Sequence, residues 1–88
     1  MVYKLEYALS AQWDLGLLDK VVAARITDKL DWFVAQETPL YFAKRLQNTK
    51  SLYRFRVGNY RIIFKTETSG IISILIVLRV KHRGEAYT

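Results

Sequence analysis

The sequence predicts an α+β fold in which two helices pack on one face of a four-stranded, mainly antiparallel sheet. Segments of alternating apolar and polar residues stand at the start of the chain and in its second half, and segments of helical period lie between them. The predicted order is an N-terminal strand, two helices and a three-stranded antiparallel meander. A chain of 88 residues can bury one core, so residues 1–88 are expected to form a single domain.

Four predicted elements fill the first half of the chain. Residues 2–9 alternate as a strand with one buried face, and Ser10 is expected to cap a short helix that ends at Gly16. Asp19 caps a longer helix with one apolar stripe, and Pro39 marks its end. The aromatic residues on or near these helical stripes are expected in the core rather than as platforms for stacking bases: Trp13, Trp32, Phe33 and Phe42.

A β-hairpin is predicted over residues 53–64, because Gly58-Asn59 separates two alternating segments and suits a two-residue turn. One face of this hairpin is then apolar, and the other carries Arg56 opposite Arg61, with Arg54 diagonally near. Like charges directly opposite each other on a sheet are destabilising. Two interpretations follow: the arginines extend into water, or this face binds an anion.

The last predicted strand, residues 71–80, is apolar on both faces and therefore reads as a central strand. Strict alternation places Val80 on the same face as Ile72, and Arg79 on the opposite face. The segment between the helices and the hairpin, residues 41–50, is polar and weakly patterned. It reads as a basic connector, either a solvated loop or a segment that steers RNA or a partner.

The net charge of +6 is concentrated in the second half, where residues 51–88 hold seven Lys/Arg and two Asp/Glu. This asymmetry indicates a polyanionic partner, either nucleic acid or an acidic protein segment. There is no cysteine and a single histidine, so we expect no thiolate or multi-histidine metal site. No apolar run is long enough to span a bilayer and no leader is visible, so we expect a cytoplasmic protein without membrane contact.

Arginines on one sheet face could bind a phosphodiester and stabilise the charge that develops when it becomes pentacoordinate, without metal or cofactor. RNA cleavage by its own 2′-OH also needs groups that move protons, and the tail supplies His82, Arg83 and Tyr87. Histidine titrates nearest neutrality, whereas tyrosine could act as a base only with a pKa well below about 10. A histidine in a tail is nevertheless more often simply solvated, and a terminal tyrosine more often packs or frays.

Three segments carry a resemblance to a known family. Residues 3–7, Tyr-Lys-Leu-Glu-Tyr, resemble its opening strand, and residues 52–64 resemble its central hairpin. The ending, His82-Arg83 followed four residues later by Tyr87, is typical of it. On these segments the chain is identified as similar to the RelE/ParE toxin superfamily, and specifically to the RelE-type mRNA interferases.

The resemblance implies a RelE-like toxin that enters the A site of the small (30S) ribosomal subunit and cuts mRNA there by 2′-OH attack. It also implies a cognate, RelB-like antitoxin and no small-molecule cofactor. The residues expected to carry catalysis are Arg61, His82, Arg83 and Tyr87. The residues expected to bind RNA phosphates are Lys44, Arg45, Arg54, Arg56, Arg79 and Lys81.

Two alternatives stay open. A toxin like the ParE branch would act on DNA gyrase without nuclease activity, and a degenerate toxin would bind RNA without cutting it. The chain also departs from the RelE pattern: Arg54 and Arg56 stand where lysine is frequent, and Lys81 stands where glycine is common before the His-Arg pair.

Overall fold

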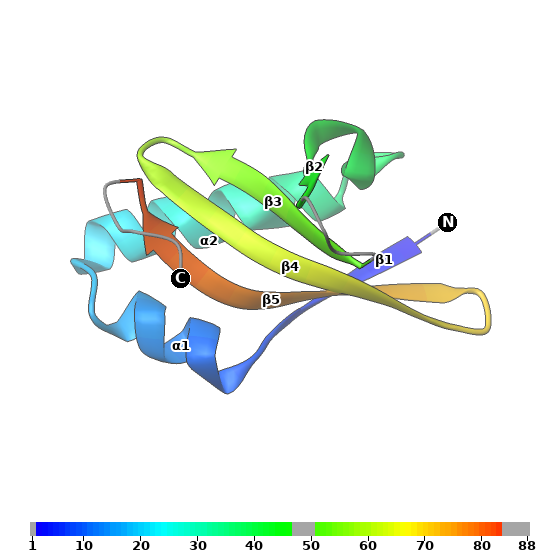
Figure 1. Ribbon diagram of the computed structural model, residues 1–88, viewed down its shortest axis with the longest axis horizontal. Coiled ribbons are helices and arrows are strands. Elements are labelled where there is room, and N and C mark those ends of the chain that lie inside the picture. The colour runs from blue at the N-terminus through cyan, green and yellow to red at the C-terminus, as the bar shows by residue number, and fades with distance from the viewer. Residues whose placement is uncertain (1, 47–50, 84–88) are drawn as a thin grey trace.

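The computed structural model describes residues 2–46 and 51–83, which form a mixed sheet with helices packed against it (Figure 1). Five strands run in the spatial order β1-β5-β4-β3-β2; β1 is parallel to β5, and the other neighbours are antiparallel. The elements, in chain order, are β1 (Val2–Tyr7), α1 (Leu9–Gly16), α2 (Lys20–Val34), the 3-10 helix η1 (Pro39–Phe42), β2 (Lys44–Arg45), β3 (Leu52–Val57), β4 (Tyr60–Ser69) and β5 (Ile72–His82).

The predicted α+β class is confirmed, but the sheet has five strands and not four. The added strand, β2, lies in the segment predicted as a connector and pairs with β3 through Lys44 opposite Arg54 and Arg45 opposite Tyr53. Two residues are too few to show an alternation, so no pattern in the sequence predicts this strand. No helix within the described parts of the chain is long and apolar enough to cross a membrane.

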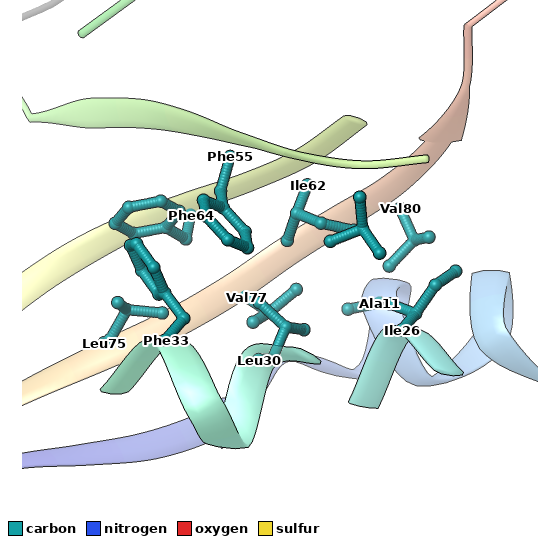
Figure 2. Close-up of a cluster of buried hydrophobic side chains, with 11 residues drawn as sticks. Ala11, Ile26, Leu30, Phe33, Phe55, Ile62, Phe64, Leu75, Val77 and Val80 are labelled. Carbon is teal, nitrogen blue, oxygen red and sulfur yellow. The ribbon is translucent and has the colours of Figure 1, made fainter. Parts of the chain in front are cut away.

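Helix α2 covers one face of the sheet and buries the core (Figure 1). Phe33 projects from α2 toward the sheet, as Figure 2 shows, and its ring centroid lies 4.0 Å from that of Phe55 and 5.7 Å from that of Phe64. Full burial of one such side chain contributes about 1.5–3 kcal/mol. The expected apolar stripe is therefore confirmed, and its fully buried members include Ile26 and Leu30.

Helix α1 lies along the edge of β5, and it does not begin at the residue that the predicted cap implies. It begins at Leu9 with Ala8 as the N-cap, so Ser10 is not the cap. The Ser10 hydroxyl instead donates a hydrogen bond to the Leu78 carbonyl at 2.6 Å. This hydrogen bond ties α1 to β5. Asp19 is the N-cap residue of α2 as predicted, although its side chain makes no capping hydrogen bond.

A β-bulge breaks the predicted alternation of β5. Arg79 lies opposite Ile63, whereas Val77 lies opposite Phe64, so β5 contains one extra residue at this point. The bulge returns Val80 to the core beside Val77, and Val80 is 5% exposed. The prediction that Val80 shares a face with the isoleucines of β5 is therefore wrong, while the central position of the strand is confirmed.

Three of the four aromatic residues expected in the core are partly or largely exposed: Trp13 is 72%, Phe42 46% and Trp32 41% accessible. Only Phe33 is buried. In α1 the one buried residue is Ala11, and a position two residues further along a helix points to nearly the opposite side. Trp13 therefore faces away from the sheet.

Candidate nucleic-acid interface

The turn at the tip of the β3–β4 hairpin has the geometry that its sequence predicts. Gly58 adopts a positive φ of 57°, which favours glycine. Val57 lies opposite Tyr60, and Arg56 lies opposite Arg61, so the predicted register is confirmed. The two arginines project from the face opposite the buried residues.

Strand β5 adds a third cation to this pair, because Lys81 lies opposite Arg61. Arg56, Arg61 and Lys81 thus form one row across three strands, with neighbouring Cβ atoms about 4.5–5.5 Å apart. Arg56 is exposed, and the other two are half-buried. A row of like charges opposes folding unless an anion or solvent screens it, which favours a site that binds anions.

A second row lies next to the first on the same face. Arg54 pairs with Ile63 of β4 on one side and with Lys44 of β2 on the other. The two rows meet in a hollow of about 230 Å³ that we call the cationic pocket, lined by Phe42, Lys44, Arg54, Arg56 and Arg61. Six residues were predicted to bind phosphate, and the structure brings four of them together. Lys44, Arg54 and Arg56 line the pocket, and Lys81 lies opposite Arg61, which also lines it.

Two hydrogen bonds to backbone carbonyls of the hairpin turn position residues next to this pocket. The Arg56 Nε donates to the Gly58 carbonyl at 3.2 Å, which ties this guanidinium to the turn. The Arg83 N–H donates to the Asn59 carbonyl at 2.6 Å, so the end of β5 is held against the same turn. Arg83 is thereby placed beside the hairpin tip, with its side chain exposed.

Arg79, which was expected to bind phosphate, is engaged by a carboxylate. Its Nε donates to Asp14 Oδ2 at 2.8 Å and its Nη2 to Asp14 Oδ1 at 3.1 Å, a bidentate pair. The Val80 N–H also donates to Asp14 Oδ2, at 2.9 Å. Burial by itself raises the pKa of Asp14, but these hydrogen bonds, the charge of Arg79 and that of Lys81 together hold the pKa below its ordinary value.

Asp14 was not singled out from the sequence, because a single carboxylate in a short helix carries no pattern. It acts where β1 ends: the pairing of β1 with β5 stops at Val77, and α1 then supplies partners for the free edge of β5. Asp14 therefore fixes the segment of β5 that carries Lys81 to the cationic row.

Two other predicted residues lie on the opposite, helix side of the sheet. Arg45 pairs with Tyr53, and its Nη2 donates to the Tyr53 hydroxyl at 3.4 Å. His82 pairs with Tyr60, and their rings meet edge to face with centroids 5.2 Å apart. The alternation of side chains along a strand separates both residues from the row of Arg56, Arg61 and Lys81.

The predicted catalytic residues are thus only partly brought together. Arg61 lines the cationic pocket, whereas His82 projects from the other side of β5. Tyr87 lies outside the described residues. Within residues 2–46 and 51–83, no three His, Cys, Asp or Glu side chains come together in a way that could hold a metal ion.

Comparison with known proteins assigns the chain to a family. A family model described as the ParE toxin of the type II toxin-antitoxin system parDE matches residues 5–87, and the chain therefore belongs to this family of toxins. Together with the similarity to a solved archaeal RelE-RelB complex, this match places the chain in the RelE/ParE toxin superfamily. No curated protein sequence matches the chain.

Several solved structures share the fold. The archaeal RelE-RelB complex from Pyrococcus horikoshii is 26% identical, with a TM-score of 0.67, and the match covers 98% of this chain and 100% of that one. The toxin-antitoxin complex RelBE2 from Mycobacterium tuberculosis is 23% identical, with a TM-score of 0.74 and coverage of 94% and 100%. A mutant Escherichia coli toxin RelE in the free state is 20% identical, with a TM-score of 0.74 and coverage of 96% and 86%. The last two similarities establish the fold alone.

Proposed function

We propose that this toxin is a ribosome-dependent endoribonuclease that cuts mRNA in the ribosomal A site without a metal ion. The observation that carries the proposal is the row of Arg56, Arg61 and Lys81 across three strands, joined to Arg54 and Lys44 in one pocket. Guanidinium groups match phosphate oxygens in geometry and keep their charge at any physiological pH. Such a cluster suits a phosphodiester whose negative charge increases as the reaction proceeds.

The proposed reaction uses the RNA as its own nucleophile. A base removes the 2′-OH proton, the 2′-oxygen bonds to phosphorus, and the bond from phosphorus to the 5′-oxygen breaks. The leaving oxygen takes a proton, which gives a 2′,3′-cyclic phosphate and a 5′-OH end. Arg61 would stabilise the pentacoordinate phosphorane. The candidates for proton transfer are His82 and Tyr87, and Arg83 is the cation beside them.

The proton-transfer roles are not equally supported by position. Arg83 is held beside the hairpin turn next to the cationic row. His82 faces Tyr60 on the other side of the strand, so it would reach the phosphate only from the end of the sheet. From these positions we propose Arg83 as a charge-stabilising group and His82 in a secondary role. The resemblance to the RelE-type interferases implies Tyr87 as the general base.

The test is cleavage of programmed ribosomes, with product ends mapped to the nucleotide. Removing one preorganised hydrogen-bond donor that stabilises the developing negative charge slows a reaction roughly 10²- to 10³-fold. We expect this loss for Arg61→Ala. Tyr87→Phe is expected to lose a comparable factor of about 10²–10⁴, as for removal of a general base. Lys4→Ala is the control, because Lys4 is an exposed cation on β1, at the opposite edge of the sheet from β2. Full activity in both site variants would overturn the proposal.

We propose further that a RelB-like antitoxin binds this toxin in the cytoplasm, as the named complexes of similar structures suggest. The surface offers an apolar hollow along α1 for such a partner, lined by Leu9, Trp13 and Leu17, which are 72–82% exposed. The net charge of +6 favours a partner segment that is also acidic. Co-purification of the toxin with the product of a neighbouring gene tests this, and Trp13→Glu is expected to release that partner.

The second candidate is a gyrase inhibitor without nuclease activity, and the matching ParE family model favours it specifically. A supercoiling assay with purified gyrase discriminates between the two. Inhibition of supercoiling together with intact ribosomal messages would replace the nuclease proposal. A toxin that binds ribosomes but yields no new RNA ends would be a non-cleaving relative.

A further inference from the structure

Among the described residues that line the cationic pocket, Phe42 is the one with an apolar side chain. The other residues that line this pocket are Lys44, Arg54, Arg56 and Arg61. Phe42 is 46% exposed, so part of its surface stays in contact with solvent beside four cations. Exposed aromatic rings next to phosphate-binding cations are the combination that proteins use for single-stranded nucleic acid, because every base offers a face for stacking.

The ring is also held in place. Trp32 of α2 meets it edge to face with centroids 5.3 Å apart, and Tyr41 does so at 5.8 Å. Pro39 at the start of η1 is buried and fixes the backbone of this short helix. A ring fixed by its neighbours loses little conformational entropy when a ligand covers it.

We propose that Phe42 is the stacking platform for a base of single-stranded RNA whose phosphate is bound by the arginines of the cationic pocket. This inference rests on the proposed function and deepens it, because it assigns one side chain to the base and not to the backbone. Phe42 is then a substrate-positioning residue: it orients the nucleotide next to the bond that is cut. A π-face accepts every base, so the contact gives position without strict sequence preference.

An acidic protein segment is the competing occupant of the same surface. It would satisfy the cations with carboxylates and cover Phe42 with aliphatic side chains. Only a nucleic acid makes the contribution of Phe42 depend on the presence of a base. The test therefore removes the base and the ring separately and together.

The experiment measures single-turnover cleavage of programmed ribosomes whose message is either intact or carries one abasic ribonucleotide, placed in turn on each side of the cleaved bond. The abasic unit keeps its 2′-OH, so the chemistry of cleavage is preserved. Phe42→Leu keeps apolar packing against Trp32 but removes the flat ring. Phe42→Trp restores a stacking surface. Ile71→Ala, which changes a 90% exposed apolar residue between β4 and β5, outside the pocket, is the control.

We expect Phe42→Leu to cut the intact message roughly 5- to 100-fold more slowly, the range that corresponds to base-aromatic stacking. Wild type should slow by a similar factor on one of the two abasic messages, and Phe42→Leu should slow no further on that message. Phe42→Trp and Ile71→Ala should cut the intact message at rates within about 2-fold of wild type, since both retain the platform.

Two results would overturn the inference while leaving the nuclease proposal intact. One is unchanged cleavage by Phe42→Leu. The other is that Phe42→Leu is slower than wild type by the same factor on the intact and the abasic messages, which would indicate a purely structural role. Failure of the nuclease proposal is seen separately, because wild type itself would then leave the intact message uncut.

Discussion

The two faces of the β3–β4 hairpin are built from alternate residues of the same strands, yet they have opposite energetics. On the helix side, Phe55 and Ile62 are buried against Phe33 of α2 and stabilise the fold. On the other side, Arg56 and Arg61 stand opposite each other and repel. Burial of the apolar face fixes the register of the strands, and this register places Arg56 opposite Arg61 on the cationic face.

This contrast separates stability from function within one element. Substitutions on the apolar face should cost stability, whereas charge changes on the cationic face should cost binding and relieve repulsion. A result in which both faces respond alike would break the comparison.

The largest stability effect is expected for Phe33→Ala. Phe33 is fully buried between α2 and the sheet, and truncation of a buried phenylalanine costs about 3–5 kcal/mol in the free energy of unfolding. Equilibrium denaturation in urea measures this loss. Trp32→Ala is the adjacent control: Trp32 is 41% exposed, so its loss should be less than half as large. Similar losses in the two variants would show that α2 packs with another face.

Asp14→Asn comes next, because it leaves Arg79 without the carboxylate that holds it. The Arg79 side chain is 43% exposed, so solvent screens the pair and we expect a loss of about 1–3 kcal/mol at pH 7. Denaturation midpoints of wild type and variant measure this loss. The exposed Asp28→Asn is the control and should change little.

The same pair sets a pH dependence. The pKa of Asp14 is held below its ordinary value in the folded state. Its stabilising effect is therefore present above the unfolded pKa of about 3.9 and is lost as the pH falls through the folded pKa. The stability difference between wild type and Asp14→Asn should shrink as the pH falls below about 4. A difference that stays constant down to pH values below both pKa values would contradict this linkage.

Arg56→Glu tests the cationic face directly. A glutamate opposite Arg61 replaces repulsion by attraction, and the fold should gain up to about 1 kcal/mol. Binding of a single-stranded RNA should weaken and become less dependent on salt, because fewer cations contact phosphates. Lys4→Glu makes the same charge change on β1, at the opposite edge of the sheet from β2. Equal loss of RNA binding in both variants would show that binding depends on net charge and not on the cationic pocket.

The smallest effect is expected for Tyr7→Phe on the helix side. The Tyr7 hydroxyl is buried and finds no hydrogen-bond partner among the residues that the structure describes. Its removal should change stability by less than about 1 kcal/mol, in the favourable direction, because an unsatisfied polar group is removed. Thermal unfolding measures this change, and a clear loss of stability would show that the hydroxyl is satisfied after all.

Tyr7 should also govern part of the alkaline behaviour. Burial, and then the charge of Asp31, raise the pKa of Tyr7 to about 12. Its contribution is fully present below the unfolded pKa of about 10 and is lost as the pH rises through the folded value. Tyr7→Phe should therefore flatten the stability profile between pH 10 and 12. An unchanged slope there would show that Tyr7 titrates normally.

Much of the fold followed from local pattern, and the failures have physical causes. The turn at Gly58-Asn59 and the stripe that ends in Phe33 were predictable, because each repeats a short period over many residues. Strand β2 was not, since two residues show no period. The exposure of Trp13 was missed because hydrophobicity alone does not say which residues of a short helix meet the core. That residues 1–88 form one RelE-like domain stays a prediction.

The site shows the same division. Arg54, Arg56 and Arg61 were placed on one face from the register alone, and the structure gathers them in one pocket. Arg79 and Arg45 were predicted to join them, but one is bound by Asp14 and the other lies beside Tyr53 on the helix side. Their surroundings depend on α1 and β2, whose positions no local pattern encodes.

The sequence by itself determined the juxtaposition of Arg56 and Arg61, because a two-residue turn and a period of two leave one register in which the aromatic residues are buried. Only the tertiary structure decided that Lys81 completes the row, since the bulge in β5 sets the phase of every residue after it. It also decided that Phe42 lines the cationic pocket and that His82 faces away from Arg61. Both outcomes depend on contacts between segments far apart in the chain.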